Sequence, residues 1–220
     1  MPADGRASFG RRLEGLLWAL RAHEGTDLFN PYRDNDPELD RPRGAAIRRR
    51  NLRSYLSAFR EARFVLVGEA AGYNGCRFSG IPFTGENLLV GERPLTWAEG
   101  LGLERSSRGP KLSAERSAHI VWGGLGGGRE FVLWNAVPWH PHHPGRSLSN
   151  RKPRRAEIDT GSPILEGFLE LYPRAQPVAV GRVAEAALRA CGHDPIYVRH
   201  PSMGGKPRFL RGLQALRARL

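Results

Sequence analysis

The sequence predicts an α/β fold: a single-domain three-layer sandwich with a mostly parallel four-stranded central sheet and helices on both faces. Four short runs of apolar β-formers alternate with longer amphipathic stretches, which is typical of βαβ units. The 220 residues fit one domain with a sizeable core. Three of the apolar runs lead directly into polar motifs, as expected where parallel strands deliver ligand-binding residues at their carboxyl ends.

Residues 1–62 are expected to form helices and an arm that pack on the core. Apolar residues from Phe9 to Leu20 recur at helical spacing and predict a helix over 8–23. Residues 25–44 carry Asn-Pro, Asp-Pro and Arg-Pro steps, typical of an ordered loop or arm, and a second helix is expected over 45–61.

Residues 63–220 are expected to form the α/β core. Four strands are expected, at 63–68, 130–135, 177–181 and 195–199. Helices are expected near 111–122, from the end of the 138–153 segment to about 172, at 182–191, and at the end of the chain, where Leu210, Leu213, Leu216 and Leu220 share one face. The connecting segments are a Gly-, Pro- and Ser-rich stretch at 69–110 with short helical stretches, a glycine turn at 123–128 and a Pro- and His-rich stretch at 138–153. A 42-residue segment such as 69–110, with little regular structure inside a compact domain, indicates a functional loop.

The charge balance points to an anionic partner. Lysine and arginine outnumber aspartate and glutamate by 34 to 22, which favours phosphate contacts with a nucleic acid. An arginine-biased genome is the alternative explanation. Two basic clusters follow polar motifs: Arg151, Lys152, Arg154 and Arg155, and Lys206, Arg208 and Arg211. A third cluster, Arg48, Arg49, Arg50 and Arg53, is interpreted as the solvated face of a helix.

Other features narrow the class of protein. Cys76 and Cys191 stand far apart and form no metal-ligand pair, so a reducing cytoplasm and neither a disulfide scaffold nor a cysteine-ligated metal are expected. No apolar run reaches the length of a membrane helix, and no signal peptide is evident. His140, His142 and His143 are interpreted as pocket-lining or phosphate-contacting residues, or as an ordinary polar loop, rather than as a zinc site, because interleaved prolines would point their imidazoles apart. We therefore expect no cofactor and a monomer.

Three polar motifs are expected to converge above the sheet. The first is the stretch GEAAGYNGCRFSGIPFTGE from Gly68 to Glu86, in which an acid at the strand end is followed 14 residues later by Phe83. Its spacing is neither G-x-G-x-x-G nor a P-loop. The second is Asn135 after Phe-Val-Leu-Trp, and the third is His200-Pro-Ser after Ile-Tyr-Val.

These motifs, in this order and strand context, resemble those of the uracil-DNA glycosylase superfamily over roughly residues 63–210. The resemblance implies excision of uracil from DNA, single- or double-stranded. It implies that Phe83 stacks on the flipped base and that Asn135 reads uracil. It also implies that His200-Pro-Ser opens the loop that inserts into DNA.

The chemistry of these residue types suits such roles. Phe83 offers a flat stacking face worth on the order of 1–3 kcal/mol per base. Asn135 can pair with uracil O4 and N3–H, a pattern that cytosine reverses. His200 can stabilise negative charge on the departing base at O2, and Glu69 can orient or deprotonate water. Gly68, Ala70 and Tyr73 are expected beside the base, with Tyr73 blocking the thymine methyl group.

The loop after His200 supplies the expected DNA contacts. Ser202 begins it, Met203 is the candidate wedge for the base stack, and Lys206 and Arg208 are the candidate phosphate ligands. A flexible surface turn is the alternative for this loop.

The sequence also departs from the family pattern. Ala70 stands where one branch has a catalytic aspartate and another an asparagine, which leaves Glu69, with Asn74 as second candidate, to position water. Relatives with GEAPG usually carry an iron–sulfur cluster on four cysteines, and two cysteines cannot supply it.

Three alternatives to a uracil-specific enzyme stay open: a weak or inactive DNA-binding member of the fold, a glycosylase for another deaminated base, and an unrelated enzyme acting on a nucleotide or sugar phosphate. No lysine is placed to form a Schiff base, because Lys206 lies in the expected DNA loop and Lys111 and Lys152 lie outside the motifs, so no lyase step is expected.

Overall fold

A four-stranded parallel sheet forms the centre of the molecule. The computed structural model describes the backbone of residues 3–220 and the side chains from residue 7 onward. The strands are β2 (Phe64–Ala70), β3 (Phe131–Val137), β5 (Gln176–Val180) and β6 (Ile196–Val198). They lie in the order β3-β2-β5-β6, and every adjacent pair is parallel. The expected sheet is confirmed.

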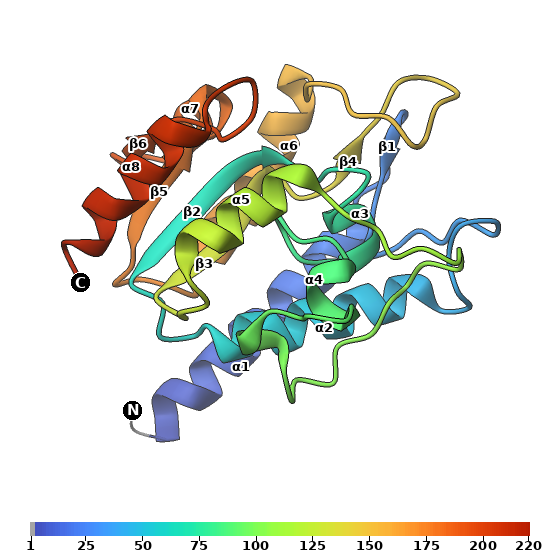
Figure 1. The fold of residues 1–220 in the computed structure, drawn as a ribbon, viewed down its shortest axis with the longest axis horizontal. Helices are drawn as coiled ribbons and strands as arrows, with labels where there is room; N and C mark the ends of the chain where they lie inside the picture. The colour runs from blue at the N-terminus through green and yellow to red at the C-terminus, as the bar shows by residue number, and fades with distance from the viewer. Residues whose placement is uncertain (1–2) are drawn as a thin grey trace.

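Helices cover both faces of this sheet, which confirms the three-layer sandwich (Figure 1). The long helices are α1 (Ala3–Ala22), α2 (Gly44–Ala58), α5 (Arg116–Leu125), α6 (Arg155–Leu169), α7 (Arg182–Ala190) and α8 (Lys206–Arg217). Helices α6 and α7 contact the strands from one side and α1 packs on α6, while α5 and α8 contact each other on the opposite side. One buried apolar cluster runs from Leu13 to Leu216, so residues of the N-terminal helices share the core of the sheet.

Short elements organise the two long connecting segments. Within 69–110 lie α3 (Cys76–Ser79), α4 (Asn87–Val90) and a 3-10 helix (Thr96–Ala98), as the expected short helical stretches. Strand β1 (Leu28–Phe29) pairs antiparallel with β4 (His140–Pro141), a contact that no sequence pattern indicated. This pairing joins the 25–44 arm to the 138–153 segment.

Three expected boundaries in the chain were wrong. Helix α5 begins at Arg116 rather than near 111, and it includes Gly123 and Gly124, which had been assigned to a turn. Gly124 lies where α5 packs on α8. A Cβ there would lie 2.7 Å from the Leu213 side chain, so the absence of a side chain permits this close packing. Helix α8 begins at Lys206, so Lys206 and Arg208 lie on its first turn and not in a loop.

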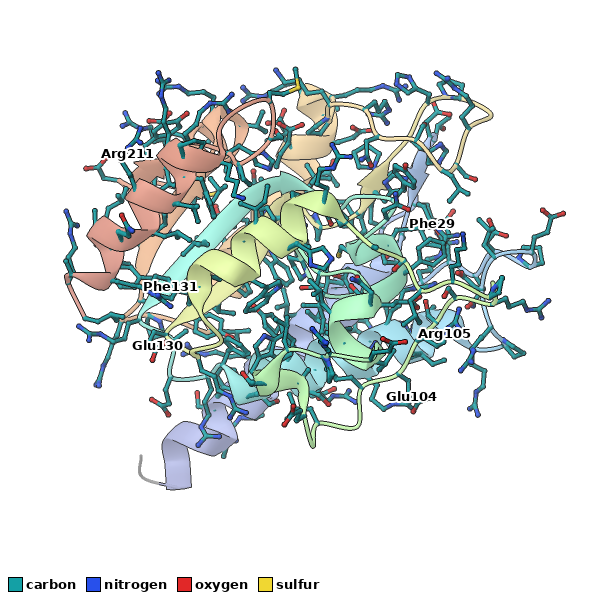
Figure 2. The ribbon with its side chains drawn as sticks, in the orientation of Figure 1. Phe29, Glu104, Arg105, Glu130, Phe131 and Arg211 are labelled. Carbon is teal, nitrogen blue, oxygen red and sulfur yellow. The ribbon has the colours of Figure 1, made fainter. Side chains whose placement is uncertain are left out.

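The arginines of α2 form a solvated face only in part: Arg50 and Arg53 are exposed, as expected, but Arg48 is not. Arg48 is fully buried, lies 3.1 Å from a carboxylate oxygen of Asp40 and donates to the backbone oxygen of Pro31. Asp40 also accepts a hydrogen bond of 2.7 Å from buried Arg77, whose guanidinium stacks on Phe29. This buried cluster of Asp40, Arg48 and Arg77 ties the arm to α2 and α3 (Phe29 is labelled in Figure 2).

Candidate functional site

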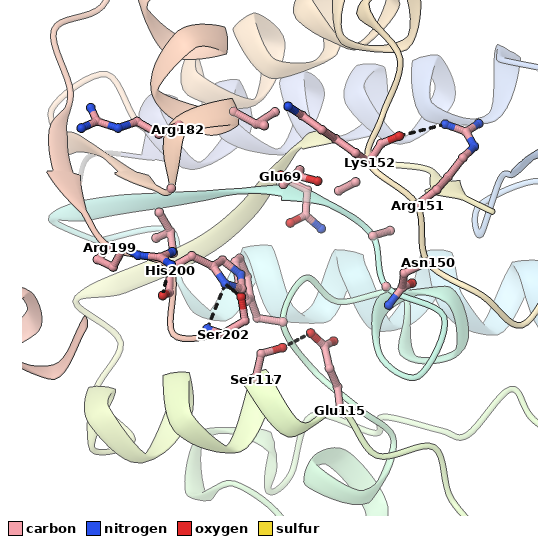
Figure 3. A pocket seen from close by; sticks show the side chains of 18 of the residues that line it. Glu69, Glu115, Ser117, Asn150, Arg151, Lys152, Arg182, Arg199, His200 and Ser202 are labelled. Carbon is pink, nitrogen blue, oxygen red and sulfur yellow. Dashed lines mark hydrogen bonds between the residues drawn. The ribbon is translucent and has the colours of Figure 1, made fainter. Parts of the chain in front are cut away.

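A cavity of about 810 Å³ lies at the carboxyl ends of the central strands. Its walls come from the end of β2, from Asn135 on β3, from the start of α7, from the loop after β6 and from the segment before and at the start of α5 (Figure 3). Residues 150–152 close another side. Of the expected site residues, Glu69, Ala70, Phe83, Asn135, His200 and Ser202 line this cavity.

Gly68 lets two of these side chains meet. It pairs in register with Asn135 on the neighbouring strand. A Cβ at Gly68 would lie 2.2 Å from the Phe83 ring and 2.9 Å from Asn135 Oδ1, closer than real atoms approach. The absence of a side chain at Gly68 therefore places the ring of Phe83 directly above β2 and beside the amide of Asn135.

Phe83 is held in an uncommon conformation. Its φ is 52°, in the left-handed region that non-glycine residues rarely adopt. The next residue, buried Thr84, donates to the backbone oxygen of Pro82 and accepts from the Trp122 indole at 3.0 Å. Such strain persists where the surroundings fix it and is concentrated at functional sites. The turn thus presents the Phe83 ring to the cavity, 6.2 Å from the His200 ring centroid.

Hydrogen bonds fix the tautomer of His200. The backbone N–H of Ser202 donates to His200 Nδ1 at 3.1 Å, and the Ser202 hydroxyl lies 2.7 Å from the same nitrogen (Figure 3). Because a backbone N–H can only donate, Nδ1 is an acceptor, and the proton of the neutral ring resides on Nε2. Burial, aided by the charge of Arg199, lowers the pKa of His200. The imidazole is therefore neutral near pH 7 and offers Nε2–H as a donor.

The loop after His200 is compact at its base and exposed at its tip. A Cβ at Gly205 would lie 1.9 Å from the His200 backbone oxygen, so only glycine fits there. Met203 at the tip has a φ of 50° and is 90% exposed. An apolar side chain presented to solvent beside the cavity suits contact with a partner surface.

Glu69 is the second residue of the first motif and lines the cavity from β2. Burial raises the pKa of its carboxyl, and the charge of nearby Lys152 opposes that rise. Lys152, which lies outside the three motifs, lines the same cavity (Figure 3). The motifs alone did not place Lys152 at the cavity, because it lies at the end of the 138–153 segment and not directly after a strand.

Some expected residues lie elsewhere. Tyr73 and Asn74 are not among the residues that line the cavity, and the backbone N–H of Tyr73 donates to Asn150 Oδ1 at 3.0 Å. The three histidines of 138–153 do not line it either. His140 is fully buried between the backbone oxygens of Ala71 and Ser147, and burial lowers its pKa to about 4. Its role is to join this segment to motif one.

The polar residues of the cavity wall that sequence reasoning missed include Glu115 and Ser117. Burial raises the pKa of Glu115, and a hydrogen bond from Ser117 lowers it. Both residues fall inside the helix expected near 111–122, where nothing in the sequence distinguished them from other polar helix residues. Their chemistry becomes visible only once α5 begins at Arg116 and leaves Glu115 at the cavity rim.

Much of the basic charge near the motifs is already paired. Arg151 forms a largely buried ion pair with Glu157 at 2.5 Å, Arg154 pairs with Asp27, and Arg155 pairs with Asp159. Within residues 7–220, Lys152, Lys206, Arg208 and Arg211 make no ion pair, and Arg211 points outward from α8 (Figure 2). Within the two basic clusters, these four cations are therefore free to meet phosphate.

The part of the chain that the structure describes contains no cluster of three or more His, Cys, Asp or Glu side chains arranged to hold a metal. It also has no helix that combines the length and apolar character needed to cross a membrane.

A family model described as the uracil DNA glycosylase superfamily matches residues 55–212. The chain belongs to this superfamily. The match includes all three motifs and the four strands of the central sheet. Membership places the protein among DNA glycosylases, which act on DNA in repair, and it confirms the resemblance drawn from the motifs.

The fold agrees with that of a solved glycosylase of this superfamily. The crystal structure of wild-type SMUG2 from Pedobacter heparinus superposes with a TM-score of 0.58 at 14% sequence identity. The similarity covers 94% of this chain and 97% of that one, so it extends over the N-terminal helices outside the family match. A search of curated proteins gives no match.

Proposed function

We propose that the protein removes uracil from DNA by hydrolysing the N-glycosidic bond of a nucleotide flipped into the cavity. The observation that carries this proposal is the convergence of Phe83, Asn135 and a neutral His200 with its proton on Nε2 at one strand-end cavity. An enzyme that acts on a base within a duplex must extrude it into such a pocket.

Two residues recognise the base in this proposal. The base stacks on Phe83, and the Asn135 amide pairs with uracil O4 and N3–H. Asn135 is 97% buried and makes no side-chain hydrogen bond within the described residues, so its amide is free to pair with a ligand. A cytosine would leave buried polar groups unsatisfied, which is how a fixed amide discriminates.

Two further residues carry the chemistry. Water attacks C1′ of the sugar, the C1′–N1 bond breaks, and its electron pair moves onto the base, largely to O2. His200 Nε2–H donates to O2 and stabilises that charge. Glu69 orients the water and accepts its proton, which finally reaches the released base. Glu69 takes the place of the carboxylate that Ala70 lacks. Tyr73 and Asn74 have no part in this scheme because they lie outside the cavity lining.

Loss of His200 is expected to abolish most base release. Without the donor to O2, His200→Ala should slow excision by roughly 10²–10³-fold, as for other donors to a developing oxyanion. The measurement is base release from single- and double-stranded oligonucleotides containing one uracil, followed by alkaline cleavage. Matched oligonucleotides with thymine or cytosine at that position test base choice.

The outcomes separate the alternatives. Release at the wild-type rate by His200→Ala would remove its leaving-group role. Tight binding of the uracil strand without release by the wild type would favour an inactive DNA-binding protein. Because Lys152 lines the cavity, borohydride trapping accompanies the assay. We expect no covalent adduct, and an adduct that disappears in Lys152→Ala would establish a lyase step instead.

A further inference from the structure

Glu115 is a cavity-lining carboxyl group that the proposed mechanism does not use. It precedes α5 at the N-cap position, yet its side chain makes no capping hydrogen bond to that helix. Its single hydrogen-bond partner within residues 7–220 is the Ser117 hydroxyl, which donates to Oε1, and no ion pair involves it. A carboxyl with no capping role and no counter-charge calls for another explanation.

Glu115 and Phe83 each occupy the space that a side chain would fill at a glycine of motif one. The Phe83 ring occupies the space above Gly68, at the start of motif one. The Glu115 carboxyl occupies the space above Gly75, where a Cβ would lie 1.9 Å from Oε2, and it also stands beside Gly72, 3.6 Å from a Cβ there. Both side chains therefore border the cavity along the same stretch of backbone, and Figure 3 shows Glu115 with Ser117 on the α5 side, across from Glu69 and Lys152.

We propose that Glu115 is a specificity-determining residue that donates a hydrogen bond from its carboxyl O–H to a carbonyl oxygen of the flipped base. This inference rests on the proposed function, since it assigns a second polar contact to the same base. An amino group in place of that carbonyl, as in cytosine, would meet a donor and be rejected. Ionised Glu115 would instead repel the carbonyl oxygen.

The surroundings favour the neutral acid. Burial raises the pKa of Glu115 above its ordinary range, because a carboxylate inside the protein loses hydration that no cation replaces. Buried Cys76 follows Gly75 within motif one, and burial raises its pKa to about 12, so it stays uncharged. The other titratable groups bordering the cavity are Glu69, Lys152, Tyr197 and His200, with the guanidinium groups of Arg151, Arg182 and Arg199.

These groups predict a bell-shaped pH profile. Release rises with pH as Glu69 ionises to act on water, and it falls again as Glu115 ionises and loses its donor. The charge of Lys152 opposes the rise in the pKa of Glu69, whereas no cation opposes the rise for Glu115, so we assign the alkaline limb to Glu115. His200 has a lowered pKa and stays neutral across the alkaline limb.

The test is the pH profile of single-turnover uracil release by wild type and three variants. Glu115→Gln keeps an N–H donor at every pH, so its profile should lose the alkaline fall that the wild-type profile shows. Ser117→Ala should move that fall to higher pH, because its hydroxyl stabilises the ionised form. Glu115→Ala should lower release at all pH values by roughly tenfold, as for one lost hydrogen bond.

A second readout is independent of activity. The infrared C=O stretch of a protonated carboxyl should be present in the free wild-type protein at neutral pH and absent in Glu115→Gln. An alkaline limb unchanged in Glu115→Gln, or the absence of that band, overturns this inference and leaves the proposed function intact. No uracil release by wild type at any pH overturns the proposed function and this inference with it.

Discussion

Single residues decide the geometry of the base pocket. Gly68 and Gly205 are both required by close approach, one to the Phe83 ring and the other to the His200 backbone oxygen. Each glycine supports a neighbour that would touch the base. The effect of replacing them is therefore expected on catalysis rather than on the fold.

Gly68→Ala is expected to displace Phe83 and Asn135. The new methyl group would overlap the ring at 2.2 Å, so the ring must move out of its stacking position. Loss of stacking should reduce uracil release by roughly tenfold or more. The measurement is single-turnover release together with the ratio of uracil to thymine release.

Gly123→Ala is the matched control, because a Cβ there meets nothing within 4 Å. It should leave release unchanged and stabilise α5 slightly, since alanine favours helix more than glycine does. Equal release by the two variants would contradict the close approach at Gly68.

At the scale of elements, we expect the loop after β6 to contact the base at its start and the DNA duplex at its tip. The loop from Pro201 to Gly205 has the His200 imidazole, the proposed donor to the base, at its start and Met203 at its tip, just before α8 begins at Lys206. Placing Lys206 and Arg208 on the first turn of α8 gives them a fixed direction beside the tip. This arrangement suits a wedge flanked by phosphate contacts.

Met203→Ala is expected to weaken binding to duplex DNA more than to a single strand. The side chain replaces stacking that only a duplex loses when a base is extruded. A loss of roughly tenfold in duplex affinity corresponds to about 1.4 kcal/mol. Fluorescence anisotropy with both kinds of uracil oligonucleotide measures it, and Trp18→Ala, an exposed apolar residue on α1, is the control. Equal losses on both substrates would rule out a wedge.

At the scale of the whole molecule, a buried ionic cluster joins the N-terminal arm to the rest. Asp40 in the arm pairs with Arg48 of α2 and Arg77 of α3, and all three side chains are inaccessible to solvent. Such a cluster contributes little net stability over apolar packing, but removal of one partner leaves a buried charge uncompensated. The arm is thereby an integral part of the domain.

Asp40→Asn is expected to destabilise the protein by about 3–5 kcal/mol, because two buried guanidinium groups would lose their shared carboxylate. Urea unfolding measures the change. Glu14→Gln breaks the exposed pair with Arg53, in which the two side chains are 57% and 49% exposed, and should cost about 1 kcal/mol or less. Similar losses in the two variants would contradict the special role of the buried cluster.

The sequence by itself determined the positions of the strands, their parallel direction and the motifs at their ends. Apolar β-forming runs mark buried parallel strands plainly, and the position of Glu69, Asn135 and His200 after such runs follows from chain connectivity alone. The Phe83 assignment depended on the resemblance to a family, because nothing in the periodicity around it indicated a turn with positive φ.

Only the tertiary structure decided which residues share the cavity. Lys152 and Glu115 line it from segments without a motif, whereas Tyr73, inside a motif, does not. Arg48 is likewise buried against Asp40, although local sequence predicted a solvated helix face. The physical reason is the same in each case: a side chain's partner, burial and ionisation depend on residues distant along the chain, which the local pattern does not specify.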